Sequence, residues 1–504
     1  MLYNTDMLGL YYKSRRKSSL FLGIFLILSA FFSPLAARAE TPSDPQYAFQ
    51  APIYNKIGAP EAWDHATGSH DVVVAVIDTG VDIWHEDLKD NIWINAGEIA
   101  GNGIDDDGNG FTDDTNGWNF VDNNNDVGLA VISKDDDPEA VTHGTVLAGL
   151  IGAAANNGFD GAGLNWNVRI MSVVAIKRNG NGSLLNVAKA VDYAAANGAD
   201  IITLSFVGDV NDARLEQSLR SAYSKGIVIV AAAGNNVVNG RNDLDQIKRY
   251  PICGDQGDPE NWILGVTSVD LSDHLSSFAD YGSCVDIAAP AEDIYSTQRY
   301  VPQYGYAKTF GGGWYGTSFS VPLVAGAAAL VKSVRPDWDA KAIISDLLST
   351  ADDIDGANAG FVGRIGYGRL DVAKAVEKAI ASKQKPAVKE QKNAKKNISV
   401  FTEYDAAGNA MAAVSAPTPL KWSVYGGGII LARLTKGKLT LESLDWTGRR
   451  HVLWSAAGIA KLSSMKVGNY WTTGEQVLMM ATQNGQAVKF TFDIGSLSWR
   501  RDVQ

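Results

Sequence analysis

Three short motifs carry the side chains that a nucleophilic mechanism needs. Asp78 begins an Asp-Thr-Gly triplet, His143 begins a His-Gly-Thr triplet, and Ser318 ends a Gly-Thr-Ser triplet. A serine hydroxyl becomes an effective nucleophile when a neighbouring imidazole takes its proton. The imidazole can do so when a buried carboxylate fixes its tautomer and stabilises the imidazolium that forms. The three motifs therefore predict acyl-transfer chemistry if the fold brings them together.

Each motif alone also has an ordinary structural explanation. Asp78 could be a turn residue after a strand, His143 could simply begin a helix, and Ser318 could cap one. The surrounding sequence favours the chemical interpretation, because Asp78 ends the apolar run 72–77 and the other two each open a helix-like stretch. In an open α/β sheet the reactive groups gather where strands end and helices begin. The three side chains are therefore expected at one edge of one sheet.

The middle of the chain alternates between strand-like apolar runs and helical patterns. Such alternation is typical of parallel βαβ units and predicts an α/β fold. We expect strands at 71–78, 169–174, 201–205, 227–232 and 262–266, and helices at 184–196, 214–225, 337–348 and 372–380.

The motifs and their order resemble those of the subtilisin-like serine proteases, or subtilases. The resemblance implies a subtilisin-like parallel-sheet sandwich with helices on both faces. It also implies an endopeptidase in which the serine attacks the scissile carbonyl, the histidine is the base and the aspartate orients the histidine. The similarity covers roughly residues 53–375 and is carried by Val-Ala-Val-Ile-Asp-Thr-Gly-Val-Asp at 74–82, His-Gly-Thr at 143–145, and Gly-Thr-Ser-Phe with Pro322 at 316–322.

A fourth similarity is the run Ala-Ala-Ala-Gly-Asn at 231–235, after an apolar strand. The resemblance implies that Asn235 donates to the oxyanion, although by itself it could be a turn former. It also implies that a peptide substrate lies as an added strand between two edge segments. The family commonly has glycine at the position of Val207, so valine there should narrow the first specificity pocket. The expected substrate-binding residues are Gly180, Gly182, Ser205, Phe206, Val207 and Gly208.

Residues 102–126 form an acidic insertion with seven aspartates and seven asparagines. Part of it, Asp-x-Asp-x-Asn-Gly from position 105, matches the first half of a calcium loop, although the glutamate of the twelfth position is replaced by asparagine. Clustered carboxylates repel one another unless a cation offsets their charge, which favours calcium over a merely polar surface loop. The expected ligands are Asp105, Asp107, Asn109, the carbonyl of Phe111, and Asp113.

The amino end has the organisation of a signal peptide at residues 1–39. Four basic residues between positions 13 and 17 precede the apolar run 20–32, and Ala-Arg-Ala at 37–39 offers a cleavage site before Glu40. We therefore expect a secreted or periplasmic protein without stable membrane association; an uncleaved membrane anchor is the alternative. Cleavage would change the formal net charge from −12 to −16, and such an acidic protein is not expected to bind nucleic acid or anionic lipid.

The chain has two cysteines, Cys253 and Cys284. An even pair in an exported protein predicts one disulfide, with two free thiols as the alternative. Closing a loop of about 32 residues would stabilise the fold by roughly 3–4 kcal/mol on the entropic model.

A length of 504 residues suggests two domains. We expect the catalytic domain at 40–377, and a lysine-rich linker at 378–398 that could instead dock an acidic partner. A small β domain is expected at 399–504, because short alternating runs are separated by turns; the pattern leaves sandwich and barrel open. This part holds five of the thirteen tryptophans, which either pack its core or form a carbohydrate-binding or peptide-binding face.

The sequence predicts an exported serine endopeptidase acting on proteins or peptides. One alternative is a catalytically silent, protease-like scaffold that binds peptides or a partner protein. Another is a calcium-dependent adhesive protein, whose binding would not depend on Ser318. The complete catalytic set favours the enzyme.

Overall fold

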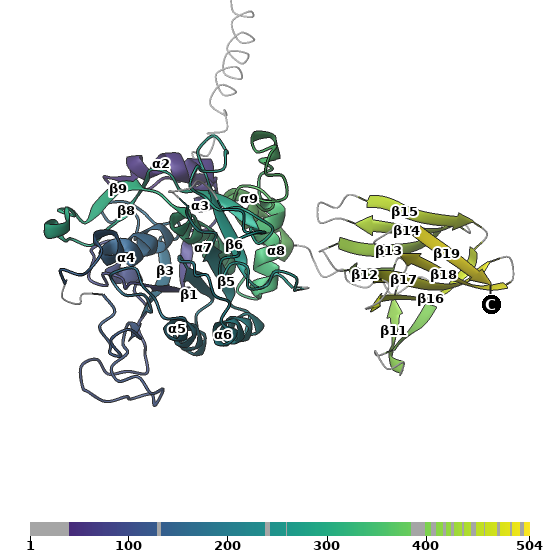
Figure 1. Cartoon of the computed structure of the whole chain (residues 1–504), viewed down its shortest axis with the longest axis horizontal. Helices are drawn as coiled ribbons and strands as arrows, with labels where there is room; N and C mark the ends of the chain where they lie inside the picture. Colours follow the sequence, from purple (N-terminus) through teal and green to yellow (C-terminus); the bar gives the residue numbers. More distant parts are fainter. Residues whose placement is uncertain are drawn as a thin grey trace, which may run out of the picture.

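The computed structural model describes residues 40–384, apart from 129–132, 237–241 and Pro259, and the strands between 399 and 503. The predicted signal peptide lies outside the described residues. At the centre is a seven-stranded sheet of order β2-β3-β1-β4-β5-β6-β7 (Figure 1), in which every neighbouring pair is parallel. Its strands are β1 (Gly68–Asp78), β2 (Gly117–Asn119), β3 (Asn167–Val174), β4 (Ile201–Leu204), β5 (Val228–Ala232), β6 (Leu264–Val269) and β7 (Ile287–Pro290).

Helices cover both faces of this sheet, which confirms the predicted α/β fold. Side chains alternate along each strand, so Val74 and Val76 of β1 enter one core while Ala75 and Ile77 enter the other. The first core is covered by α4 (Pro138–Gly152), α7 (Thr317–Val334), α8 (Ala340–Thr350) and α9 (Val372–Gln384), and the second by α5 (Leu184–Ala196) and α6 (Ala213–Ser224) (Figure 1).

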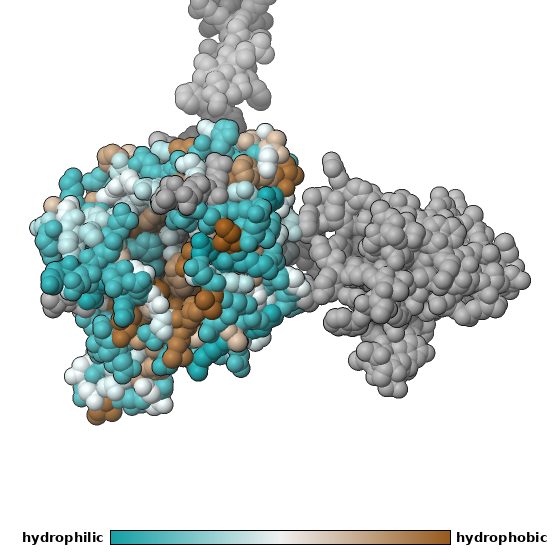
Figure 2. Space-filling view, viewed as in Figure 1, coloured by the Kyte–Doolittle hydropathy of each residue, from teal (hydrophilic) through white to brown (hydrophobic). Residues whose placement is uncertain are grey.

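Helix α7 runs through the middle of the first core. By length and composition it could cross a membrane, but 78% of it is buried inside the domain, as expected of a core helix. Outside, hydrophilic residues cover most of the face seen in Figure 2, and apolar residues gather in a band across its middle.

Several short elements complete the catalytic part. Two helices precede the sheet and bury Tyr54 and Trp63, and a two-stranded antiparallel hairpin lies between β7 and α7. The elements are α2 (Tyr47–Lys56), α3 (Ala59–Trp63), β8 (Ile294–Thr297) and β9 (Phe310–Trp314), with the 3₁₀ helices η1 (Lys89–Asn91), η2 (Pro302–Tyr304) and η3 (Asp355–Ala357).

Several boundaries differ from those expected by a few residues, and two of them bear on the site and the linker. His143 does not begin a helix: α4 starts at Pro138, where the Asp137 side chain accepts hydrogen bonds from the first free N–H groups, so His143 lies in the second turn. Helix α9 continues to Gln384, so the first residues of the predicted linker are helical. The rest of that linker, 385–398, lies outside the described residues.

The strands between 399 and 503 pair only with antiparallel neighbours, in two four-stranded sheets and one two-stranded sheet. This part of the chain is therefore β, as the alternating pattern predicts. Its strands are β10 (Ser399–Tyr404), β11 (Ala410–Ala416), β12 (Leu420–Val424), β13 (Gly428–Thr435), β14 (Lys438–Leu444), β15 (Arg450–Ala457), β16 (Ile459–Tyr470), β17 (Gly474–Gln483), β18 (Gln486–Asp493) and β19 (Ser498–Val503).

Candidate active site

Asp78 is the last residue of β1, a strand paired on both sides. Its carboxylate is buried, with 2% of the residue exposed. One oxygen, Oδ1, accepts hydrogen bonds from the Thr79 N–H at 2.8 Å, the Thr79 hydroxyl at 3.1 Å and His143 Nδ1 at 2.8 Å. The strand end therefore holds a fixed hydrogen-bond acceptor against one side of the imidazole.

One steric and one polar contact explain why glycine and threonine follow His143 in this fold. A Cβ on Gly144 would lie 2.3 Å from the Gly80 carbonyl oxygen, so only glycine lets α4 approach the end of β1. The next residue, Thr145, accepts a hydrogen bond from the Asp82 N–H at 3.0 Å. Both residues hold the histidine-bearing helix against the aspartate-bearing loop.

The surroundings of His143 favour its protonated form. Burial of the imidazole lowers its pKa, but the charge and hydrogen bond of Asp78 and the charge of Glu139 outweigh burial. The pKa of His143 therefore lies above its ordinary value. Since Nδ1 is occupied by Asp78, the other ring nitrogen, Nε2, is left to exchange protons with a substrate or nucleophile.

Ser318 lies in the first turn of α7, and its hydroxyl donates to the main-chain carbonyl of Ser205 at 3.0 Å. The Ser205 hydroxyl in turn donates to the Ser318 carbonyl at 3.0 Å, so the end of β4 holds the start of α7. Within the described part of the chain, no hydrogen bond joins Ser318 to His143. Catalytic hydrogen bonds often tighten only when substrate is bound, and a rotation about χ1 would redirect this hydroxyl.

Asn235 follows β5 and is oriented by the residue before Ser318. Its Oδ1 accepts hydrogen bonds from the Thr317 N–H at 2.9 Å and the Thr317 hydroxyl at 3.1 Å. Its Nδ2 has no acceptor among the described residues. A Cβ on Gly316 would stand 3.0 Å from that Nδ2, so glycine leaves room for the amide. The sequence interpretation did not identify Thr317 as the residue that orients Asn235.

The two segments expected to bind substrate lie at loops beside β3 and β4. Gly180 adopts a left-handed φ of +79° in the turn of a tight loop whose sides meet at Ile176 and Gly182. The Gly208 N–H donates to the Tyr250 carbonyl at 2.7 Å, which ties down the segment after β4. Both methyl groups of Val207 would be 3.5 Å from a Cβ on Gly234, so the valine occupies space beside the candidate oxyanion donor.

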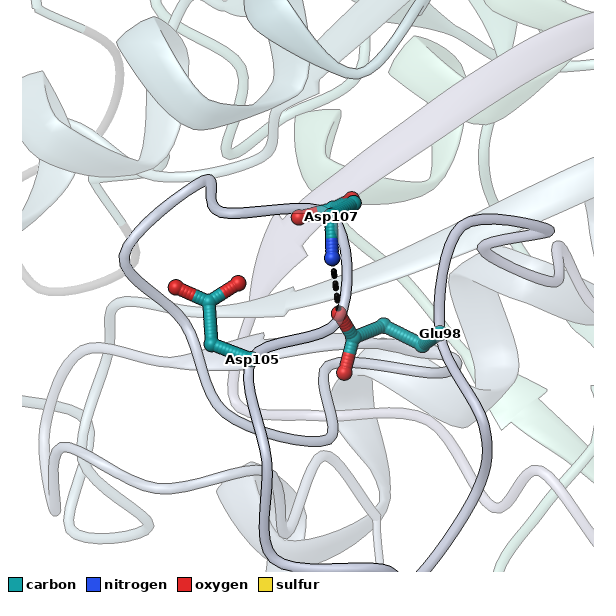
Figure 3. Close-up of side chains that lie close together, drawn as sticks. All are labelled: Glu98, Asp105 and Asp107. Atoms are coloured by element: carbon teal, nitrogen blue, oxygen red, sulfur yellow. Dashed lines mark hydrogen bonds between the residues drawn. The ribbon is translucent and has the colours of Figure 1, made fainter.

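The acidic insertion gathers a carboxylate group that includes one unexpected residue. Glu98, Asp105 and Asp107 each offer an oxygen within 4.8 Å of the others (Figure 3). Glu98 precedes the insertion and also accepts from the Asp107 N–H at 3.2 Å. Among the described residues, no lysine or arginine pairs with these three. Asp113 is not part of the group; its carboxylate accepts hydrogen bonds from the N–H groups of Asn102 and Gly103.

The other two expected ligands have different surroundings. The Asn109 amide donates to Asp107 Oδ2 at 3.1 Å, and the Phe111 ring packs against Tyr193 with centroids 5.0 Å apart. Phe111 therefore anchors the loop to helix α5.

Cys253 and Cys284 form the predicted disulfide, with Cα atoms 5.0 Å apart. Both residues are buried. The bond joins the loop after β5 to the segment before β7.

Comparison with known proteins gives a consistent result. Residues 69–368 match the model of the Subtilase family. Thermitase from Thermoactinomyces vulgaris is 35% identical over 338 residues, which are 67% of this chain and 99% of that protein. A halolysin-like extracellular serine protease from Natrialba magadii is 30% identical over 342 residues, 67% of this chain and 53% of that protein. A solved protease structure from Pseudoalteromonas arctica superposes with a TM-score of 0.53 at 28% identity, over 68% of this chain and all of that one.

Proposed function

Because the chain belongs to the subtilase family and is a subtilisin-like serine endopeptidase, we propose that it cuts peptide bonds with Ser318 as nucleophile. His143 is the base and Asp78 orients it. The observation that carries this assignment is the 2.8 Å hydrogen bond between Asp78 Oδ1 and His143 Nδ1. It fixes the proton on Nδ1 and leaves a lone pair on Nε2, the tautomer that a general base requires.

The reaction follows from this arrangement in two halves. The Ser318 hydroxyl leaves the Ser205 carbonyl, gives its proton to His143 Nε2 and attacks the scissile carbonyl. The imidazolium, stabilised by Asp78, then gives the proton to the leaving amine. Water repeats the sequence on the acyl-enzyme and frees Ser318.

The negative charge that develops on the carbonyl oxygen needs donors that are already in place. We propose that Asn235 Nδ2 is one, because Thr317 holds the other end of the amide. The Ser318 N–H is the second, because N–H groups in the first turn of a helix lack intrahelical partners.

Replacing Asn235 with alanine should therefore lower kcat by ~10²–10³ and change KM little, a magnitude measured in a member of this family. Initial rates on a peptide p-nitroanilide would give both constants. The matched control is Asn236→Ala, which changes the next amide of the same loop and should keep kcat within a few-fold. A change confined to KM in Asn235→Ala would indicate substrate binding instead.

Calcium binding at the acidic insertion is a further part of the proposal. Ligand oxygens around one calcium ion, each at ~2.3–2.6 Å, lie within about 5 Å of one another. The oxygens of Glu98, Asp105 and Asp107 meet this spacing, at up to 4.8 Å. Asn109 and the Phe111 carbonyl, which the calcium-loop pattern names, would supply neutral oxygens. When bound, calcium would offset the carboxylate charges and hold the insertion in one conformation.

Chelation should accordingly lower the thermal unfolding midpoint. A ligand that binds only the native state stabilises it by about 2.7 kcal/mol at 100 times its Kd. Asp105→Ala combined with Asp107→Ala should remove most of the difference between calcium and chelator in a calorimetric scan. Asp122→Ala, in the same insertion but outside the carboxylate group, should retain it. Superimposable wild-type scans in calcium and in chelator would exclude the site.

We also propose that the protein is exported and that its catalytic part folds by itself. The predicted signal peptide, the disulfide, which is typical of oxidising compartments, and a relative named as extracellular support export. Both buried cores and all candidate catalytic residues lie before Gln384, which supports an independent catalytic domain before a lysine-rich linker.

Mass spectrometry should test both points. The protein recovered outside the cell should begin at Glu40, and brief proteolysis should cut between 385 and 398, because exposed linkers are cleaved first. The released fragment 40–384 should still hydrolyse a short peptide. Protein found only inside the cell would contradict export, an unprocessed amino end would favour the uncleaved membrane anchor, and a fragment that unfolds would contradict domain independence.

A further inference from the structure

A cavity of about 810 Å³ opens beside Phe319, the residue after Ser318. Pockets of this size with aromatic walls and few charges are typical of binding sites. Its walls come from the β8–β9 hairpin, the start of α7 and helix α2. The aromatic side chains that line it include Phe49, Tyr295, Tyr306, Phe310, Trp314 and Phe319.

The aromatic wall is continuous with the candidate base. The Phe319 ring lies 5.6 Å from the His143 ring, between centroids, and 5.8 Å from the Trp314 ring. The Tyr306 ring stacks on Trp314 at 5.7 Å. Asn235 also lines the cavity. The cavity therefore begins where the scissile bond would lie and extends away from it.

The mechanism decides which part of a substrate enters this cavity. The protonated imidazole gives its proton to the leaving amine, so the leaving segment must lie on the side of His143 and Phe319. The acyl half is expected along 205–208, the predicted substrate-binding segment that begins beside Ser318, where the Ser205 carbonyl accepts the serine hydroxyl. Neither 180–183 nor 205–208 lines the cavity. The cavity is thus placed to bind substrate residues that follow the scissile bond.

The composition of the walls indicates the side chain that fits. Glu139 and Lys308 are the two charged residues of the lining, so the described walls carry no net charge. The β9 backbone passes directly against an aromatic ring, because a Cβ on Gly312 would lie 2.2 Å from Tyr295. Flat rings and bare backbone favour a flat apolar guest over a charged one.

We propose that this cavity binds an aromatic or large apolar side chain on the leaving-group side of the scissile bond, and so determines where the enzyme cuts. The inference rests on the proposed function, since it requires the acyl-enzyme at Ser318. It deepens that function by naming a substrate preference that depends on the β8–β9 hairpin and not on the acyl-side loops.

Capture of the acyl-enzyme by added amines isolates the leaving-group side. The mature protein is acylated with a peptide methyl ester, and water competes with phenylalanine amide or glycine amide. In aminolysis the amine nitrogen forms a bond to the acyl carbon, the bond from that carbon to Ser318 Oγ breaks, and the amine proton passes through His143 to Oγ. Chromatography gives the ratio of peptide amide to hydrolysed acid for each amine.

We expect phenylalanine amide to be captured about tenfold better than glycine amide, the factor of one aromatic contact. Trp314→Ala should reduce this preference several-fold. Trp314 also packs against the first core, so Tyr306→Ala, at a half-buried position outside that core, should do the same if the first variant folds poorly. The preference is a ratio within each variant, so a general loss of activity does not affect it. Tyr300→Ala is the control, because Tyr300 is an exposed residue of the same hairpin that does not line the cavity. This variant should keep the wild-type ratio.

The outcomes separate this inference from the proposed function. Wild-type protein that forms an acyl-enzyme but captures both amines equally would overturn the inference alone. An undiminished preference in both Trp314→Ala and Tyr306→Ala would also overturn it, because the selectivity would then come from elsewhere. Failure to form any acyl-enzyme would overturn the assignment of Ser318 and this inference with it.

Discussion

Replacing Ser318 with alanine should reduce kcat by about 10⁶, the factor found when the nucleophile of a subtilase is removed. The substitution removes the attacking oxygen and adds no atoms to a half-buried position. It also removes the hydrogen bond to the Ser205 carbonyl, which should cost only about 1 kcal/mol of folding free energy. Initial rates on a peptide p-nitroanilide, with the unfolding midpoint measured on the same sample, would separate the two effects.

Ser320→Ala is the matched control for this experiment. Ser320 lies on the same helix, and its buried hydroxyl donates to the Ala289 carbonyl at 2.9 Å. Its loss should lower stability by a similar amount and leave turnover nearly unchanged. Wild-type turnover in Ser318→Ala would contradict the assigned nucleophile. A wild-type protein that binds peptides and never cuts them would instead favour the silent scaffold.

Replacing Asp78 with asparagine should lower kcat by about 10⁴, the loss seen in another serine protease when the equivalent carboxylate is neutralised. Asparagine is nearly isosteric, so the end of β1 should keep its shape. The missing charge no longer stabilises the imidazolium, and an amide can donate to Nδ1 and select the wrong tautomer. The kcat/KM of the variant and the wild type, measured from pH 5 to pH 9, would test this.

The pH dependence of activity provides a second test of Asp78→Asn, because the direction in which the acid limb moves is predicted. Protonated His143 cannot act as a base, so activity is lost as the pH falls through its pKa. Asp78 raises that pKa, and the wild-type acid limb should therefore lie above the ordinary value of about 6.5. In Asp78→Asn the charge of Asp78 no longer offsets burial, which is the largest influence, so the pKa of His143 falls and the acid limb moves to lower pH.

Glu139→Gln is the control for a charge that acts on His143 without a hydrogen bond to the imidazole. Glu139 also raises the pKa of His143, but it forms no hydrogen bond with the imidazole in the described structure. Its loss should move the acid limb slightly in the same direction and retain most of kcat. An acid limb that moves to higher pH in Asp78→Asn would contradict the arrangement of the pair.

Strands β1, β3, β4, β5 and β6 were predictable from sequence because each is a short apolar run, whereas β2 is the three-residue Gly-Trp-Asn inside the acidic insertion and was not predicted. Helix α5 has the predicted bounds, and the end of β1 falls at Asp78 as expected. The start of α4 was missed because its first turn is polar: Asp137 caps it and Pro138 begins it, which extends the helix beyond the apolar stretch. Helix α2 was not anticipated, since it contains Pro52.

Residues that meet only through the tertiary fold could not be read from spacing. Glu98 joins the carboxylate group from outside the acidic insertion, where no motif marks it. Thr317 orients Asn235 across 82 residues of chain. The aromatic cavity depends on α2, the β8–β9 hairpin and α7 meeting in space. In each case the local sequence gives the residue type but not its partner.

Covalent labelling with a fluorophosphonate tests the central claim most directly. A serine activated by His143 displaces fluoride from the probe, while ordinary serines react far more slowly. Peptide mapping of the folded, mature protein should place one label per molecule on Ser318, with slower labelling in Asp78→Asn and none in Ser318→Ala. A label on another serine, or no label on wild-type protein that is demonstrably folded, would contradict the assignment of this active site.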